Sequence, residues 1–502
     1  MLRSCVWMVG AVGLGLVGCH RGGGHNTPQP APATLATGPA VCAAGKAGDF
    51  PCSGISLLKR LPHSAMGGSE GNDIWGWTDP QTQLELALVG QTTGTAFVDV
   101  TDPTAPHYLG RLPTQTSASA WRDIKVYQDH AYVVADGAGQ HGMQIFDLTR
   151  LRYIPSMPTS FAPDAVYTGF ANAHNLAIDE STGFAYAVGT NTCNGGLHMM
   201  DIRVPESPVF VGCHAAADTH DTQCVSYQGP DTNYTGREIC VSSNGDHIAI
   251  VDVTDKTAPL MLATLTYPQL GFTHQGWLTE DQRFFLLGDE LDERNFGLAT
   301  RTLVFDLGNL EAPTFLYAYS ASTRTIDHNL YVRGNRVFEA NYTSGLRLLQ
   351  FADLSARDLH EIAYFDTFPA GDAVVFDGAW SVYPYLPSGN IIVNDISNGL
   401  FVLGLDVLTV LAGPDQSTFA GQSLLLEGTS SRPVTHVIWR QTRGTPATIA
   451  DPAALVTSVT LPSLVIPETL TFELTVTDRA GATATDTIHI RADVIGPGRT
   501  TP

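Results

Sequence analysis

The chain has 502 residues, more than one compact core usually holds, so two or more domains are expected. Acidic residues outnumber basic ones, 49 to 27, and the net charge of −22 argues against nucleic acid or an anionic membrane surface as a partner. Cation binding also fits an acidic chain, although solubility is the simpler explanation. The 49 glycines and 30 prolines, with only 15% charged residues, indicate many tight turns between short strands.

The N-terminus is typical of an export signal. Arg3 precedes an apolar stretch over residues 6–17 that is too short to span a bilayer, and Leu16-Val17-Gly18-Cys19 matches a bacterial lipoprotein box. We expect residues 1–18 to be removed and Cys19 to carry the lipid, which makes the membrane a partner; the alternative is a plain secretory signal. His20 after Cys19 resembles the pattern of outer-membrane or cell-surface lipoproteins. Residues 19–41 are predicted to be a flexible Gly/Pro tether.

One short phrase recurs along the middle of the chain. Its first copy runs from Gly94 to Asp102: a glycine turn, a β-prone apolar run, an Asp and a Pro-containing turn. Copies return about every 50 residues, which is the repeat length of propeller blades. The sequence therefore predicts an all-β, seven-bladed β-propeller over residues 42–406. The positions that end the seven apolar runs are Asp99, Asp147, Asp201, Asp252, Asp306, Gln350 and Gly404.

Each repeat divides into four expected strands, for example residues 174–179, 184–189, 197–202 and 209–213 in the third. The second repeat has no clear fourth strand in residues 150–170. The seventh runs out of sequence after its third strand, but residues 56–62 closely copy residues 107–113, the fourth strand of the first repeat. We therefore expect residues 55–61 to complete the seventh blade, which closes the ring and removes its exposed edges.

Residues 407–495 show a different pattern of short alternating strands around Trp439, which predicts a β-sandwich with this tryptophan in its core. The stretches at residues 412–415, 437–441 and 474–481 resemble polycystic-kidney-disease-type (PKD-like) immunoglobulin domains, which are usually spacers or adhesive elements. Residues 496–502 are predicted to be a disordered tail.

Six cysteines remain once Cys5 and Cys19 are set aside, and six cysteines permit 15 pairings. The expected strands select one pairing, because antiparallel neighbours bring the ends or matching positions of two strands together. A zinc site is the alternative, but the chain has no Cys-x-x-Cys spacing, and export permits disulfides. The predicted pairs are Cys42–Cys52, Cys193–Cys213 and Cys224–Cys240.

A histidine stands at the start of the first strand in four consecutive repeats: His174, His220, His274 and His328. If these residues converge on the channel mouth, imidazoles with neighbouring carboxylates suit a divalent metal or a polar ligand. The alternative is that each histidine is a repeated strut to the adjacent blade, since repeats also copy structural residues. The other candidate ligand-binding residues near this face are Arg122, Asp123, Asp221, Asp289, Glu290, Asp327 and Trp380.

Other catalytic patterns are weak. The chain contains no Gly-x-Ser-x-Gly elbow, His-Glu-x-x-His, phosphate loop or dinucleotide-binding fingerprint. The aspartates that end the repeated phrase precede turns, where an Asp side chain normally bonds its own backbone, so we interpret them as turn residues.

The stretch from Cys42 to Leu405 resembles the choice-of-anchor B family, whose members carry LVIVD-type propeller repeats. The resemblance depends on text such as Trp75-Gly76-Trp77-Thr78-Asp79, Ala173-His174-Asn175, Thr273-His274-Gln275-Gly276-Trp277 and Asp327-His328-Asn329. It implies a surface-attached protein, and it supplies no reaction.

Two functional hypotheses follow. The first is a non-catalytic, lipid-anchored binding protein at the outer membrane or cell surface, with an unidentified protein, glycan or small molecule as ligand at the histidine- and acid-lined face. The second is a metal-dependent hydrolase or oxidoreductase at the same mouth. No cofactor is assigned apart from a candidate divalent metal.

Overall fold

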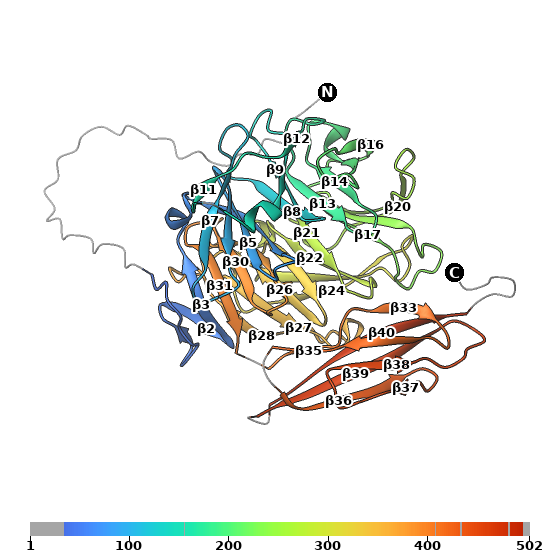
Figure 1. Ribbon diagram of the computed structural model, residues 1–502. Helices are drawn as coiled ribbons and strands as arrows, with labels where there is room; N and C mark the ends of the chain where they lie inside the picture. The colour runs from blue at the N-terminus through green and yellow to red at the C-terminus, as the bar shows by residue number, and fades with distance from the viewer. Residues whose placement is uncertain (1–34, 155, 407, 432–433, 480–481, 495–502) are drawn as a thin grey trace, which may run out of the picture. The chain divides into compact units, whose positions relative to one another are not determined.

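The computed structural model describes residues 35–154, 156–406, 408–431, 434–479 and 482–494 (Figure 1). The predicted signal peptide, Cys19, most of the predicted tether and the predicted tail lie outside the described residues. What is described is mainly β-strand, which confirms the all-β class. Within these residues, none of the helices has the length and apolar character needed to cross a membrane.

Seven separate sheets follow one another between residues 46 and 405 of the described chain, and nearly all their strand pairs are antiparallel. In the first sheet the order is β11 (Thr159–Ser160), β7 (His107–Pro113), β6 (Gly94–Asp99), β5 (Glu85–Gln91) and β4 (Gly71–Thr78). The second has β12 (Ala165–Tyr167), β10 (Met143–Asp147), β9 (His130–Ala135) and β8 (Arg122–Tyr127). The third has β13 (Asn175–Asp179), β14 (Phe184–Val188), β15 (Leu197–Asp201) and β16 (Val209–His214).

The later sheets repeat this order. The fourth has β17 (Asp221–Ser226), β18 (Glu238–Ser243), β19 (Ile248–Asp252) and β20 (Leu260–Leu265). The fifth has β21 (Thr273–Leu278), β22 (Phe284–Asp289), β23 (Arg301–Asp306) and β24 (Thr314–Ser320). The sixth has β25 (Asn329–Arg333), β26 (Arg336–Ala340), β27 (Leu346–Gln350) and β28 (His360–Phe365), extended by β2 (Phe50–Ser53) and β1 (Lys46–Ala47). The seventh has β29 (Ala379–Tyr383), β30 (Ile391–Asp395), β31 (Gly399–Leu405) and β3 (Ile55–Leu61).

Helices in this part of the chain are short. The α-helix α1 (Asp292–Phe296) lies between β22 and β23. The described 3-10 helices are η1 (His63–Met66), η2 (Leu148–Leu151), η3 (Cys193–Gly195) and η4 (Leu354–Ala356). The fourth strand that the sequence left unplaced in the second repeat is β12, which pairs with β10.

The first strands of successive sheets contact one another. The contacts run from β4 to β8, β13, β17, β21, β25 and β29, and β29 in turn contacts β4. Apolar side chains fill the space between neighbouring sheets, so the core consists of several clusters. One of them joins Ile74, Val89 and Val98 of the first sheet to Ile392 and Val402 of the seventh.

The turn after the third strand has the predicted chemistry. Asp99 Oδ1 accepts the backbone N–H of Thr101 at 2.9 Å, and Asp252 Oδ1 accepts that of Thr254 at 3.0 Å. Asp147, Asp201 and Asp306 make the same bond to the residue two positions later. The interpretation of these aspartates as turn residues is confirmed, because each uses its carboxylate to close an Asx turn.

β3 pairs with β31 as the fourth strand of the seventh sheet, although more than 300 residues separate the two strands in sequence. The ladder contains a one-residue register shift between Leu57 and Lys59. The same shift occurs where the third strand meets the fourth in the first, third, fourth, fifth and sixth sheets. A β-bulge at a repeated position is a designed feature of a sheet, so β3 is equivalent to the fourth strands of the other sheets.

Glycines at the start of the repeated phrase serve this pairing. Gly399 has φ +100°, and a Cβ there would collide with the carbonyl oxygen of Leu61 on β3. Gly94 has φ +146° and meets Leu112 on β7 in the same way. The glycine is therefore required by the close approach of the fourth strand.

Residues before β3 are also held. Ala40 and Leu57 exchange backbone hydrogen bonds of 2.8 and 3.0 Å, and Arg60 N–H donates to Thr37 at 3.1 Å. These bonds place the last residues of the predicted tether against β3.

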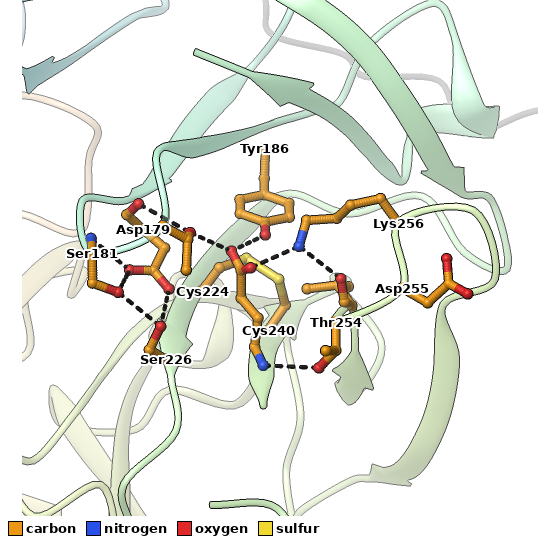
Figure 2. Close-up of polar contacts among 12 residues, drawn as sticks. Asp179, Ser181, Tyr186, Cys224, Ser226, Cys240, Thr254, Asp255 and Lys256 are labelled. Atoms are coloured by element: carbon orange, nitrogen blue, oxygen red, sulfur yellow. Dashed lines mark hydrogen bonds and ion pairs between the residues drawn. A yellow bond between two sulfur atoms is a disulfide. The ribbon is translucent and has the colours of Figure 1, made fainter. Parts of the chain in front are cut away.

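The three predicted disulfides, Cys42–Cys52, Cys193–Cys213 and Cys224–Cys240, are confirmed. Cys224 and Cys240 are directly opposite each other on β17 and β18. Beside them, a buried ion pair joins Lys256 Nζ to Glu238 Oε2 at 2.6 Å, and the hydroxyl of Tyr186 on β14 donates to the other oxygen of Glu238 (Figure 2). Polar contacts therefore link the third and fourth sheets next to a disulfide.

The C-terminal strands form separate sheets around their own core. β33 (Gln416–Phe419), β40 (Thr483–Asp493), β39 (Glu468–Asp478) and β36 (Val434–Arg443) make one; β34 (Ser423–Glu427), β38 (Val456–Thr460) and β37 (Thr448–Ile449) make another; β32 (Val410–Leu411) pairs with β35 (Thr429–Ser430). Trp439 is 3% exposed within this core and donates from Nε1 to the Ala454 carbonyl at 3.1 Å. Its predicted core position is confirmed.

Candidate metal centre

Four imidazoles lie in a continuous row. His174, His220 and His328 stand immediately before β13, β17 and β25, and His274 is the second residue of β21. Successive ring centroids are 4.2, 4.5 and 4.4 Å apart. The row arises because first strands of neighbouring sheets pack together and the histidine occupies the same position on each.

The Nδ1 atoms of the row bind neighbouring groups. His220 Nδ1 lies 3.2 Å from the carbonyl oxygen of His274, and His328 Nδ1 bonds the carbonyl oxygen of Trp380. His274 Nδ1 makes no hydrogen bond of ordinary geometry. Because a carbonyl oxygen can only accept, Nδ1 of His220 and His328 must donate, so Nε2 of each neutral ring carries a lone pair. His174 differs, with Nδ1 3.1 Å from Asp136 Oδ2.

Glu290 faces two of these rings. Its Oε2 lies 3.9 Å from His274 Nε2 and its Oε1 lies 3.7 Å from His328 Nε2. One ligand atom from each of the three residues falls within 4.8 Å of the others. The two separations are too long for hydrogen bonds. They are close to the spacing of about 3.4 Å between neighbouring ligands of a tetrahedral ion at about 2.1 Å.

Burial controls the charge of this cluster. It lowers the pKa of His220 and of His274 well below the ordinary value and that of His328 to about 3. Burial also raises the pKa of Glu290 to about 7, against the opposing effect of the Tyr342 hydroxyl, which donates to Oε1 at 2.9 Å. The histidines are therefore neutral near pH 7, which is the form that binds metal ions.

A small cavity lies at the row, with about 20 Å³ of space for the centres of water molecules. That is room for about one water, and too little for an organic substrate. Its predicted lining residues are the four histidines with Arg122, Asp123, Asp221 and Trp380; its other lining residues are Asp73, Trp121, Asn175 and Asn329.

Several cavity residues also connect neighbouring sheets. Asp123 Oδ2 accepts the backbone N–H of Leu176 at 2.9 Å, and its Oδ1 bonds Lys125 Nζ at 2.7 Å. Asp73 Oδ2 accepts the N–H of Ile124 at 3.0 Å, one sheet earlier. The strut role considered for the histidines is thus also filled by carboxylates a few residues away on the same strands.

The remaining predicted ligands have distinct surroundings. Asp221 Oδ2 accepts from the amide of Asn175, and Arg122 donates from Nε to the Gln91 carbonyl at 3.1 Å. Asp289 uses both oxygens within its loop: Oδ1 accepts the N–H of Phe272 at 2.6 Å and Oδ2 that of Gly271 at 2.7 Å. Asp289 therefore has a complete set of local partners and lies apart from the row.

Sequence reasoning missed Tyr342, Asp73 and Lys125. Tyr342 follows β26 in the loop that also carries Asn341, so its position in the repeat was a usable signal. Asp73 and Lys125 had no such signal, because their neighbours come from different sheets.

Comparisons with known proteins bear mainly on the C-terminal domain. Residues 412–491 match the model of a PKD-domain family. The solution structure of the PKD domain from KIAA 1837 protein covers 18% of this chain and 92% of its own, at 20% identity and TM-score 0.16. The PKD-like character predicted for this domain is supported by the family match.

The likenesses that extend over most of the chain are weak. The crystal structure of a protein from Lactobacillus plantarum shares 14% identity over 65% of this chain and 88% of its own, with TM-score 0.41. A functionally unknown protein from Desulfotomaculum acetoxidans shares 12% identity over 61% of this chain and 89% of its own, with TM-score 0.39. No curated protein matches the chain. The choice-of-anchor B resemblance stays a prediction.

Proposed function

We propose that this chain is a metal-binding protein that holds a divalent transition-metal ion at His274, Glu290 and His328. The observation that carries the proposal is the spacing of Glu290 from the two Nε2 atoms, 3.7 and 3.9 Å, which is too long for hydrogen bonds and suited to a shared ion.

The surroundings fit the same role. Metal-binding histidines usually donate their other ring N–H to a carbonyl or carboxylate, as His328 does to the Trp380 carbonyl. The Tyr342 hydroxyl orients Glu290 in the same manner. Strut and ligand are therefore compatible roles, one for each ring nitrogen. Two imidazoles and a carboxylate suit Zn²⁺ and the neighbouring transition metals.

The scaffold of this site is, in our proposal, a seven-bladed β-propeller of the LVIVD-repeat, choice-of-anchor B type. The contacts between successive first strands, which return from β29 to β4, support this arrangement, as does the placement of β3 as a fourth strand.

We also propose that the protein is exported and anchored by a lipid on Cys19 at the outer membrane or cell surface, with a protein, glycan or small molecule as a further ligand. The lipoprotein box at residues 16–19 supports the anchor. In this proposal Cys19→Ser moves the chain from the membrane fraction to the soluble exported fraction. Unchanged membrane association would refute it.

Metal binding is tested by stripping the purified chain with a chelator and titrating it with Zn²⁺ and with Co²⁺. We expect one equivalent to bind at the site and Co²⁺ to give the visible absorption of a four-coordinate ion. Glu290→Gln should weaken binding at least about tenfold. His107→Ala, which removes an exposed histidine on β7, is the matched control and should bind like the wild type.

His328→Asn separates the two roles of the imidazole. An Asn amide can still donate to the Trp380 carbonyl in place of Nδ1, but it removes Nε2. We expect this variant to lose the bound ion while keeping the unfolding midpoint of the metal-free wild type. A wild type that takes up neither ion with His328-dependent stoichiometry would leave the row as struts alone and refute the proposal.

A metal-dependent enzyme is the second candidate, favoured by one observation. Three protein ligands leave a fourth position open, where a bound Zn²⁺ activates water. The cavity of about 20 Å³ favours simple ion binding instead. Zinc-dependent hydrolysis of a small activated ester, absent from His328→Asn, would favour the enzyme.

A further inference from the structure

A second group of ligating side chains, which we call the acid cluster, consists of Asp292, Glu293 and Asp327. The first two open α1, and Asp327 stands two residues before β25. One oxygen from each carboxylate lies within 4.8 Å of the others. All three residues are buried: Asp292 is 0% exposed, and Glu293 and Asp327 are each 3% exposed.

The oxygens of the acid cluster are mostly unpartnered. Glu293 Oε1 and Oε2, Asp327 Oδ1 and Oδ2, and Asp292 Oδ1 make no hydrogen bond. Asp292 Oδ2 alone is held, by the guanidinium of Arg301, whose Nε lies 2.6 Å away. Buried carboxylate oxygens normally find donors, and leaving them without partners is costly.

Local charge makes the shortage sharper. Arg301 offers one positive charge to three buried carboxylates, and Asp289 and Glu339 lie near enough to Asp327 to add to its negative surroundings. A like-charged buried group of this kind requires either protons or a cation. Gly288 makes room for the cluster, because a Cβ at that position would strike Asp327 Oδ1.

The spacing is that of an oxygen-ligated ion. Two oxygens bound to one Ca²⁺ at about 2.4 Å lie at most about 4.8 Å apart. Five unpartnered oxygens approach the six to eight ligands that Ca²⁺ takes. Mg²⁺ fits less well, since it keeps several waters and seldom uses an all-protein cage.

We propose that Asp292, Glu293 and Asp327 form a second cation site, distinct from the histidine site, that binds a hard divalent cation and fits Ca²⁺ best. The ion neutralises the cluster and ties α1 to the segment that leads into β25. It thereby stabilises the loop that carries Glu290. This inference stands on its own residues and does not require a metal at the histidines.

The test uses the full chain, freed of metal with a chelator and titrated with CaCl₂ or with MgCl₂. For the wild type we expect the thermal unfolding midpoint to rise with Ca²⁺, and to rise less with Mg²⁺ at the same concentration. Equilibrium dialysis should show one Ca²⁺ fewer per chain in the Glu293→Gln, Asp327→Asn double variant. Comparing the two chains removes any Ca²⁺ bound elsewhere.

The two sites are separated by reciprocal variants. Glu290→Gln should keep the Ca²⁺ response and weaken Zn²⁺ binding, whereas the double variant should lose the Ca²⁺ response. If the double variant binds as much Ca²⁺ as the wild type, the proposal is overturned. A wild type with no Ca²⁺ response, joined to a more stable double variant, would show that protons hold the cluster and would also overturn it.

One measurement needs no substitution, in case the double variant does not fold. Ca²⁺ should slow amide hydrogen exchange in wild-type peptides that cover residues 289–297 and 323–330. Equal exchange in these peptides with and without Ca²⁺ contradicts the proposed site.

Discussion

At the scale of single residues, the imidazoles of the row divide their ring nitrogens between two tasks. His328 Nδ1 holds the Trp380 carbonyl of the next sheet, while its Nε2 faces Glu290. The sequence presents structural and functional interpretations of such a histidine as alternatives, because a residue name does not say which nitrogen has which partner. The side-chain geometry makes both roles available to one ring.

A buried histidine outside the row supports a pH prediction. His198 is 3% exposed, its two nitrogens each lie 2.8 Å from a hydroxyl, of Tyr167 and of Thr192, and burial lowers its pKa to about 4. Between its ordinary pKa of about 6.5 and the folded value, the unfolded chain binds the extra proton, so stability is full above that window and falls as pH falls through it. The wild type should lose about 2 kcal/mol relative to His198→Gln between pH 7 and pH 5.

Urea unfolding of both chains at the two pH values measures this difference, and the other titrating groups cancel in the comparison. His107→Gln, at an exposed site, should follow the wild type at both pH values. A constant gap between wild type and His198→Gln would contradict the assigned cause.

At the scale of elements, β3 shows how a distant segment completes a sheet. Its copy of the text around β7 was legible in the sequence, and its pairing with β31 has the same register shift as the other fourth strands. β12 was not legible, because three residues carry too little periodicity to be distinguished from loop. β2 also escaped prediction, since it extends the sixth sheet by pairing with β28.

The docking of β3 can be tested at one buried position. Leu57 is 1% exposed, and Leu57→Ala should cost about 2–5 kcal/mol because it leaves a cavity and weakens the pairing with β31. Lys59→Ala on the same strand, at a partly exposed position, should cost less than about 0.5 kcal/mol. Denaturant unfolding gives both values, and amide exchange at residues 400–403 should quicken only in Leu57→Ala.

Equal losses of stability in the two variants would mean that β3 is not held by its buried face. An increase in aggregation of Leu57→Ala on storage is the expected companion effect, since an undocked β3 exposes the edge of β31.

At the scale of the whole molecule, the described chain is a series of similar sheets followed by a domain of another kind. The C-terminal domain has its own apolar cluster, which includes Trp439, Phe472 and Ile488. Between the earlier sheets the apolar clusters each join two neighbours, as the cluster of Ile74 and Val402 does. In this arrangement every sheet buries one face against the previous sheet and one against the next, which explains why a single repeated phrase serves throughout.

The sequence by itself determined the all-β class, the disulfide pairs, the Asx turns, the PKD-like domain and the row of histidines. All of these depend on local patterns or on repetition: a β-prone run, an Asp before a turn, a position copied from repeat to repeat. The sequence also marked residues 289–293 as the densest acidic stretch.

Only the tertiary structure decided which of these side chains meet. Glu290 faces His274 and His328, whereas Asp289 beside it is consumed by backbone N–H groups. Asp327 joins Asp292 and Glu293, although more than thirty residues separate them. A site is made by residues from different sheets, and the distances between them follow from packing between strands, which no local pattern encodes.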